Sequence, residues 1–262
     1  MSVYADLIRY RELFANLFQR ELRVKYKGSV LGVAWSLANP LVLMGIYVLV
    51  FSTLWHVANG IDHYPLYLLS GLTVWIFFAS SLETASRSML DSADLIKKVR
   101  FPRQLVAFSV VATQLVTFGV MFSVLFVVNL VLLPRTRGEI WLAIPLACVL
   151  VAFVAGVALA VASLNVVFRD VEHLVGALLL PWFFLTPILY SFSQFRSHHT
   201  ITQVLHYANF VTPAIYSIRA PLYEGRLPSG ADVAYLCVAA AVALALGAFV
   251  FSRVDDRIAV EL

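Results

Sequence analysis

Long apolar runs, separated by short charged or polar stretches, form the main pattern along this chain. We predict that six of them cross a membrane: residues 30–55, 65–82, 105–133, 140–168, 174–190 and 233–251. A helix needs about 20 mostly apolar residues to cross a bilayer, and each run is near or above that length. The pattern therefore predicts an all-α integral membrane protein with six transmembrane helices in one domain, residues 1–262.

Residues 1–27 have a different pattern, in which apolar positions recur at helical spacing. One face carries Val3, Leu7, Tyr10, Phe14, Leu17 and Phe18, and the opposite face is polar. Such a helix fits the plane of a membrane interface. Packing on a soluble core is the alternative, but no soluble core follows. In the first apolar run, Asn39-Pro40 is predicted to begin the hydrocarbon-crossing part, because proline lacks an N–H and suits an initial helical turn.

Two segments break the apolar pattern. Residues 87–103, RSMLDSADLIKKVRFPR, are strongly charged. Their charges from Asp94 to Arg100 have helix-compatible spacing, and Phe101-Pro102 ends that helix because the residue before a proline avoids helical angles. Residues 191–230 are too polar and broken to cross a membrane. Two short interfacial helices, or a re-entrant pair, would fit there. Pro181 and Pro187 fall within the fifth run and predict a kinked helix.

Composition supports the membrane assignment. Hydrophobic residues make up 61% of the 262 positions and charged residues only 13%, whereas soluble domains have about 45–50% and 25%. The two cysteines, Cys148 and Cys237, lie in apolar runs, where we expect buried side chains. The basic residues lack the aromatic interleaving typical of nucleic-acid binding, so no nucleic-acid partner is expected.

The distribution of Lys and Arg predicts the orientation. With both termini on one side of six spans, 14 of the 19 basic residues lie on that side. The other side receives five: Arg135, Arg137, Arg196, Arg219 and Arg226. Because cytoplasmic loops carry an excess of Lys and Arg, both termini are predicted to be cytoplasmic.

Catalytic motifs are missing from the sequence. It contains no Gly-Lys pair, which rules out a phosphate-binding loop of the G-x-x-x-x-G-K-[ST] type, and no G-x-S-x-G, H-E-x-x-H or C-x-x-C. His198, His199 and His206 form the one local histidine cluster. Without acidic or cysteine neighbours in the sequence, they favour ordinary loop histidines over a metal site. Besides energy-driven transport, two other functions remain as alternatives: an intramembrane enzyme and an ATP-independent channel.

The apolar runs contain almost no ionisable residues, so a proton- or ion-coupled carrier is disfavoured. Energy for transport would then come from a partner at the cytoplasmic face. Four aromatic residues lie near the predicted ends of spans or within them: Trp35, Tyr47, Trp75 and Trp182. They suit an interfacial aromatic belt. Alternatively, they provide stacking surfaces for sugars in a channel.

Several blocks of the sequence resemble a known family. They are RELRVKYKGSVLGVAWSLANPL, DLIKKVRFPRQ, NVVFRDVEHLVGALLLPWFFLTPILYS and the C-terminal FSRVDDRIAVEL. In this order they resemble the polysaccharide and polyol-phosphate export permeases, which are the membrane subunits of type-2 ABC exporters for O-antigen, teichoic acid or galactan. One departure is Val211-Thr212-Pro213, where Asn-Pro is expected.

The resemblance implies a homodimer in a bacterial cytoplasmic membrane that recruits two copies of an ABC ATPase. The ATPase would bind ATP and Mg²⁺, so no cofactor is expected on this chain. A polysaccharide linked to a polyprenyl diphosphate would pass between the two permease subunits, with residues 191–230 gating the outer mouth.

The resemblance also suggests roles for charged residues. The ATPase-coupling candidates are Arg87, Asp91, Asp94, Lys97, Lys98, Arg100, Arg169 and Asp170. The candidates for binding the lipid headgroup are Arg20, Arg23, Lys25 and Lys27. Cations at the cytoplasmic interface attract phosphate, although these four could equally serve only to set the topology.

Overall fold

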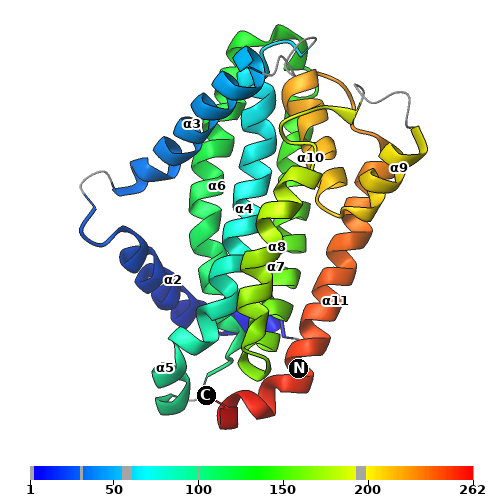
Figure 1. The fold of residues 1–262 in the computed structure, drawn as a ribbon. Helices are drawn as coiled ribbons and strands as arrows, with labels where there is room; N and C mark the ends of the chain where they lie inside the picture. The colour runs from blue at the N-terminus through cyan, green and yellow to red at the C-terminus, as the bar shows by residue number, and fades with distance from the viewer. Residues whose placement is uncertain (1–2, 30–31, 55–60, 100, 193–198, 262) are drawn as a thin grey trace.

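The computed structural model describes residues 3–29, 32–54, 61–99, 101–192 and 199–261, and within these ranges every regular element is helical (Figure 1). The longer helices are α2 (Arg11–Tyr26), α3 (Trp35–Val48), α4 (Tyr64–Asp91), α6 (Gln104–Leu132), α7 (Ala143–Val167), α8 (Asp170–Leu185) and α11 (Gly230–Glu261). Short helices are α1 (Ala5–Arg9), α5 (Ala93–Lys98), α9 (His199–Ala208), α10 (Thr212–Arg219), and the single turns η3 (Pro134–Thr136) and η4 (Ile140–Leu142). Helix α3 continues into η2 (Leu49–Leu54), and α10 into η6 (Ala220–Glu224).

Within the described ranges, four helices are long and apolar enough to cross a membrane: α4, α6, α7 with its preceding turn, and α11. The prediction of an all-α membrane protein is therefore confirmed in outline. Helix α4 is central, since 72% of its most apolar stretch is buried, against 22% for α6 and for α11. The outward faces of α6 and α11 remain apolar and exposed, as expected for surfaces that face lipid.

Helices α7 and α11 approach each other closely at two glycines. A Cβ atom added to Gly156 would collide with the backbone of Ala243 and Leu244, and one added to Gly247 would collide with the carbonyl of Gly156. Small residues allow this kind of backbone approach in membranes, where packing rather than hydrophobic burial holds helices together.

Helices α3 and α8 correspond to the first and fifth predicted spans but are shorter. The predicted position of Pro40 in an initial helical turn was wrong: α3 begins at Trp35, and Pro40 lies inside it. That the hydrocarbon-crossing part begins at Asn39-Pro40 stays a prediction. Because proline has no N–H, the Ser36 carbonyl loses its usual helical donor. The predicted kink at two prolines was also wrong in part. Pro181 lies inside α8, but the helix ends at Leu185, before Pro187.

The N-terminal amphipathic helix is present in two pieces, α1 and α2, with a break at Tyr10. Its apolar face packs on the bundle: Leu17 is buried, and Val3, Leu7, Tyr10 and Phe14 lie against the core. Helix α2 contacts α6 most extensively. The apolar face thus meets protein, and its position in a membrane interface stays a prediction.

The charged segment 87–103 contains the last turn of α4, helix α5 and the loop to α6. Figure 1 shows α5 and both marked termini at one end of the bundle, which we call the α5 end. Two short helices, α9 and α10, occupy the predicted 191–230 region. Both cysteines are exposed, so the prediction of buried side chains was wrong. They lie on the outward faces of α7 and α11.

Candidate functional site

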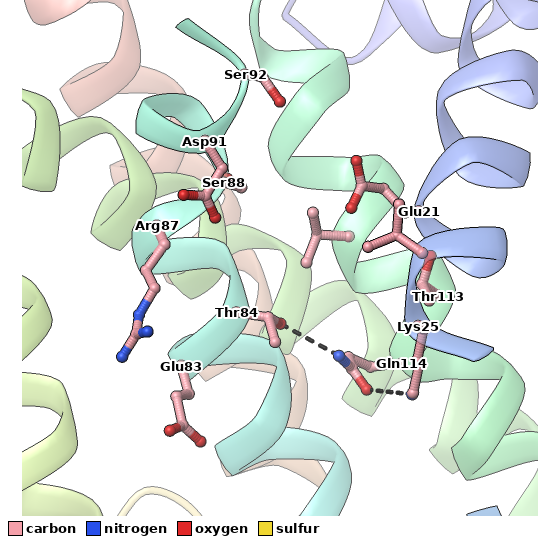
Figure 2. Close-up of a pocket in the computed structure, with 12 residues that line it drawn as sticks. Glu21, Lys25, Glu83, Thr84, Arg87, Ser88, Asp91, Ser92, Thr113 and Gln114 are labelled. Carbon is pink, nitrogen blue, oxygen red and sulfur yellow. Dashed lines mark hydrogen bonds between the residues drawn. The ribbon is translucent and has the colours of Figure 1, made fainter. Parts of the chain in front are cut away.

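A polar cavity of about 490 Å³ lies near the α5 end, between α2, α4 and α6. Figure 2 shows Glu21 and Lys25 approaching from α2, opposite Glu83, Thr84 and Asp91 of α4. The cavity also contacts Arg87, Ser88, Ser92, Thr113 and Gln114. Its lining therefore mixes three carboxylates with two cations, which is an unusual content for the flank of an apolar bundle.

Lys25 lies at the boundary of this cavity and a second one. Its Nζ donates to Gln114 Oε1 at 2.7 Å and to Thr117 Oγ1 at 2.8 Å, both on α6. Gln114 in turn donates to Thr84 Oγ1 of α4 at 3.3 Å (Figure 2). Although the residue as a whole is exposed, partial burial beside the bundle lowers the pKa of the Lys25 ammonium, because burial disfavours the charged form.

The second cavity is larger, about 800 Å³, and lies between the end of α2, the start of α3 and the α4–α6 surface. It is lined by Lys25, Lys27, Trp35, Asn39 and Pro40, together with Tyr26, Ile76, Ser80 and Thr117. No carboxylate is among its lining residues in the part of the chain that the structure describes. Two cations, two aromatic side chains and the side-chain amides of Asn39 and Gln114 thus share one half-open space.

The four predicted headgroup residues lie in different surroundings. Lys25 and Lys27 line the second cavity, whereas Arg20 and Arg23 line a surface groove along α2, which Lys27 also borders. Arg20 pairs with Glu21 at 2.6 Å and also donates to Ser92 Oγ at 2.9 Å. Arg20 therefore joins α2 to the linker between α4 and α5.

Helix α5 carries three of the predicted coupling residues outward. Asp94, Lys97 and Lys98 are exposed, while Ile96 is buried and anchors the helix to the bundle. Arg100 lies outside the described residues. Just beyond it, Arg103 pairs with Asp255 at 2.9 Å and bonds the Asp255 backbone carbonyl, which ties the segment to α11. The exposed charges of α5 therefore lie on a helix that Ile96 and the Arg103–Asp255 pair hold against the rest of the structure.

The remaining coupling candidates lie around the first turn of α8. Arg169 and Asp170 are exposed at its start. Arg87 of α4 pairs with Glu172 of α8, with Nε 3.0 Å from Oε1. Asp91 is exposed and lines the first cavity. The structure therefore brings α4 and α8 together at this point. Whether any of these residues contacts an ATPase stays a prediction.

Three of the four candidate channel aromatics lie close together. Tyr47 stacks on Phe183 with centroids 5.7 Å apart, and Trp75 meets the same ring at 5.7 Å. Trp182 packs on Phe210 at 4.5 Å and donates from Nε1 to Asn209 at 2.9 Å. Trp35 is 52% exposed and lines the second cavity instead. Trp75 is buried within the chain.

Arg219 was counted among the five cations on the outer side, but its burial was not predicted. The side chain is fully buried in α10, where Nε donates to Ser70 Oγ and Nη1 to the Pro187 carbonyl, both at 3.0 Å. Its guanidinium lies 3.8 Å from the centre of the Tyr67 ring. A single arginine inside the apolar stretch 210–223 was the signal that could have revealed it.

Two further polar residues were missed or misjudged. Asn165, fully buried at the end of α7, bonds both α4 and α8. His206 has no acidic neighbour in the sequence, but its Nε2 lies 2.7 Å from Oδ1 of Asp232 in α11. Among the described residues, no group of three or more His, Cys, Asp and Glu side chains is arranged to hold a metal ion.

Comparison with known proteins now identifies the family. The family model described as "ABC-2 type transporter" matches residues 12–223, which is most of the chain. This chain belongs to the ABC-2 type transporter family. An O-antigen export system permease protein, RfbA, from Myxococcus xanthus is 32% identical over 254 residues, covering 97% of this chain and 96% of the relative. Two permeases of the same name from Klebsiella pneumoniae are 35% and 36% identical over 185 residues, 69% of each chain.

Membership of the ABC-2 type transporter family makes this chain a multi-pass membrane component of a transporter. It favours transport over the intramembrane-enzyme alternative, and the resemblance drawn from the sequence is confirmed. Family membership also implies an ABC ATPase as partner.

Proposed function

We propose that this chain is the permease of an ATP-driven exporter that moves a lipid-linked polysaccharide across a bacterial cytoplasmic membrane. Two copies of the chain would assemble with two copies of an ATPase that binds ATP and Mg²⁺. The exposed charges of α5 support the ATP-driven part of the proposal, because they form a surface on which an ATPase could dock, next to the Arg103–Asp255 pair that holds this segment to α11. The near end-to-end similarity to an O-antigen export permease supports the class of cargo.

The proposed topology has six spans, with α3 and α8 added to the four long helices. Successive members of this set run in opposite directions along the bundle (Figure 1). An even number of crossings agrees with both termini at the α5 end, which we assign to the cytoplasm because most Lys and Arg residues belong to elements at that end. At 16 residues, α8 is about 24 Å long, which is just short of the hydrocarbon thickness.

The proposed conduit lies between two subunits, lined by α3 and α8. Both helices leave large apolar side chains exposed: Leu41, Val42 and Ile46 on α3, followed by Leu49 at the start of η2, and Leu174, Leu178, Leu180, Phe184 and Leu185 on α8. The aromatic group of Tyr47, Trp75 and Phe183 joins the two helices through α4. Movement of either helix would therefore disturb the other.

The second cavity is the better place for the diphosphate of a lipid carrier. Lys25 and Lys27 supply cations there, whereas Glu21, Glu83 and Asp91 in the first cavity would repel a phosphate. Trp35 and Pro40 give the same cavity an apolar side that suits the polyprenyl chain or a sugar face. The cavity opens beside α3, next to the proposed conduit.

The proposal is tested by ATP hydrolysis with purified proteins. The chain alone should hydrolyse no ATP, and the complex with the ATPase encoded beside it should. The double variant Lys97→Glu/Lys98→Glu should abolish the stimulation, because the reversed charges face the docking surface, while Arg137→Glu at the opposite end should not. Failure of the two proteins to co-purify in mild detergent would contradict the proposal, as would full stimulation by the double variant.

A further inference from the structure

Helix α8 is attached to α4 at its first turn by two separate contacts. The amide of Asn165, fully buried at the end of α7, donates from Nδ2 to the Ser86 carbonyl at 2.8 Å. Its Oδ1 accepts the backbone N–H of Glu172 at 2.9 Å. That N–H is one of the four at a helix start that have no partner within the helix, and no side chain caps α8 from its own N-terminus. Asn165 therefore caps the first turn of α8 and, through the Ser86 carbonyl, also binds α4.

The second contact is the Arg87–Glu172 ion pair, at 3.0 Å. Glu172 lies in the first turn of α8, where a negative charge is favourable because of the helix dipole. The pair is partly exposed, with side chains 54% and 25% accessible, so it adds little to stability. Its position is more informative: Ser86 and Arg87 are consecutive and lie near the end of α4, just before α5.

The segment after α8 is bound to the other end of α4. Tyr64 donates from its hydroxyl to the Leu189 carbonyl at 2.9 Å, and Tyr67 to the Tyr190 carbonyl at 2.8 Å. Arg219 of α10 donates to the Pro187 carbonyl and to Ser70 of α4, each at 3.0 Å. Both ends of α8 are thus held by polar contacts to α4 or to residues that α4 contacts.

Between its ends, α8 packs on the core along one side, where Val175, Leu179 and Trp182 are partly buried. Along α8, which the structure describes throughout, Phe183 is the one buried side chain. Phe183 contacts Trp75, and Trp182 contacts Phe78. A helix that one element holds at both ends and along its packed side moves with that element. Here that element is α4, whose last turn leads directly into α5.

We infer that Asn165 and the Arg87–Glu172 pair are positioning residues that transmit displacement of α5 to α8, and so couple ATP hydrolysis to movement of the conduit wall. The inference rests on the proposed function and deepens it. It also reassigns Arg87: its role is a contact within the chain, not docking of the ATPase. Loss of the Arg87–Glu172 pair should therefore stop export while ATP hydrolysis continues. Loss of ATPase docking should stop both ATP hydrolysis and export.

The test is a charge exchange, measured in the complex with the ATPase. Arg87→Glu and Glu172→Arg should each lower export about tenfold or more, since coupling between two sites is typically worth a factor of 5–150. ATP hydrolysis should stay near the wild-type rate. The double variant Arg87→Glu/Glu172→Arg should restore export, because it re-forms the pair in reverse.

The Arg135–Asp62 pair provides a control, because it is also an exposed ion pair, with side chains 43% and 77% accessible, and it lies outside both α5 and the proposed gate region 191–230. Reversing Arg135 alone should leave export unchanged. Asn165→Asp gives a second variant, which keeps the acceptor for Glu172 N–H but loses the donor to Ser86. It should uncouple export in the same way.

Three results would overturn the inference: unchanged export in both single variants, no recovery in the double variant, or loss of ATP hydrolysis and ATPase binding in Arg87→Glu. The last would restore the docking role. Absence of ATP hydrolysis in the wild-type complex would instead contradict the proposed function, so the two failures are distinguishable.

Discussion

Lys25 illustrates how the cations of one helix can have separate roles. Its ammonium is held by Gln114 and Thr117 of α6, so it points into the space between α2 and the bundle. Arg23, two residues earlier, lies on the outer face beside a surface groove. A cation that only sets topology needs no such partners, because the positive-inside rule depends on the count of Lys and Arg residues near the span.

This difference predicts unequal effects of neutralisation. Lys25→Met should reduce export, because it removes a cation from the cavity proposed for the diphosphate. Arg23→Met should have a much smaller effect, since it removes the same charge from the outer face of the same helix. Export of the polymer to the cell surface measures the effect, and a reporter fused to the C-terminus checks topology. Equal loss of export in the two variants, or loss only when topology changes, would contradict the headgroup assignment.

Buried polar residues were the least predictable part of the site. Arg219, Asn165 and the His206–Asp232 pair all depend on contacts between residues far apart in sequence. Hydropathy places a charged residue in the nearest loop, and it cannot reveal that Ser70 and the Pro187 carbonyl provide buried partners for an arginine. By contrast, the exposed charges of α5 were predictable, because local spacing alone indicated a short charged helix.

Among the elements, the long helices were predictable and the short ones less so. Residues 105–133 were predicted as a span, and α6 covers Gln104–Leu132. The position of Pro40 in α3 and the end of α8 were misjudged, because prolines there were given roles that the backbone does not follow. Pro40 is accommodated inside α3, and Pro187 lies in the loop whose carbonyls bind Arg219 and two tyrosines.

The α7–α11 contact supplies a prediction about stability. Gly156→Ala should lower the free energy of unfolding by about 1–3 kcal/mol, because the added methyl group would push apart two helix backbones. Thermal denaturation in detergent measures the change. Gly119→Ala in α6 is the control, since nothing lies within 4 Å of the added atom. It should be neutral or stabilise the helix by up to about 1 kcal/mol. Equal melting temperatures for the two variants would show that the close approach is not required.

At the scale of the whole molecule, one end of the bundle gathers the parts that a driven exporter needs. Helix α5, the start of the basic helix α2 and both termini lie there (Figure 1). The second cavity lies further along the bundle, beside Ile76 of α4 and Thr117 of α6. Helices α3 and α8 leave apolar faces without a partner in the described chain. A second copy would cover part of these faces and leave the remainder to enclose a conduit. An ATPase at the α5 end would then act on α8 through α4.

Transport itself tests this account most directly. Inverted membrane vesicles containing the chain and its ATPase would be given a lipid-linked polysaccharide on their outer, cytoplasmic surface. We predict that ATP makes the polymer resistant to an added glycosidase, as it moves into the vesicle lumen, and that a hydrolysis-deficient ATPase or the Lys97→Glu/Lys98→Glu variant prevents this protection. Polymer that stays fully accessible with ATP, or becomes protected without it, would contradict the assignment of this chain as an ATP-driven polysaccharide export permease.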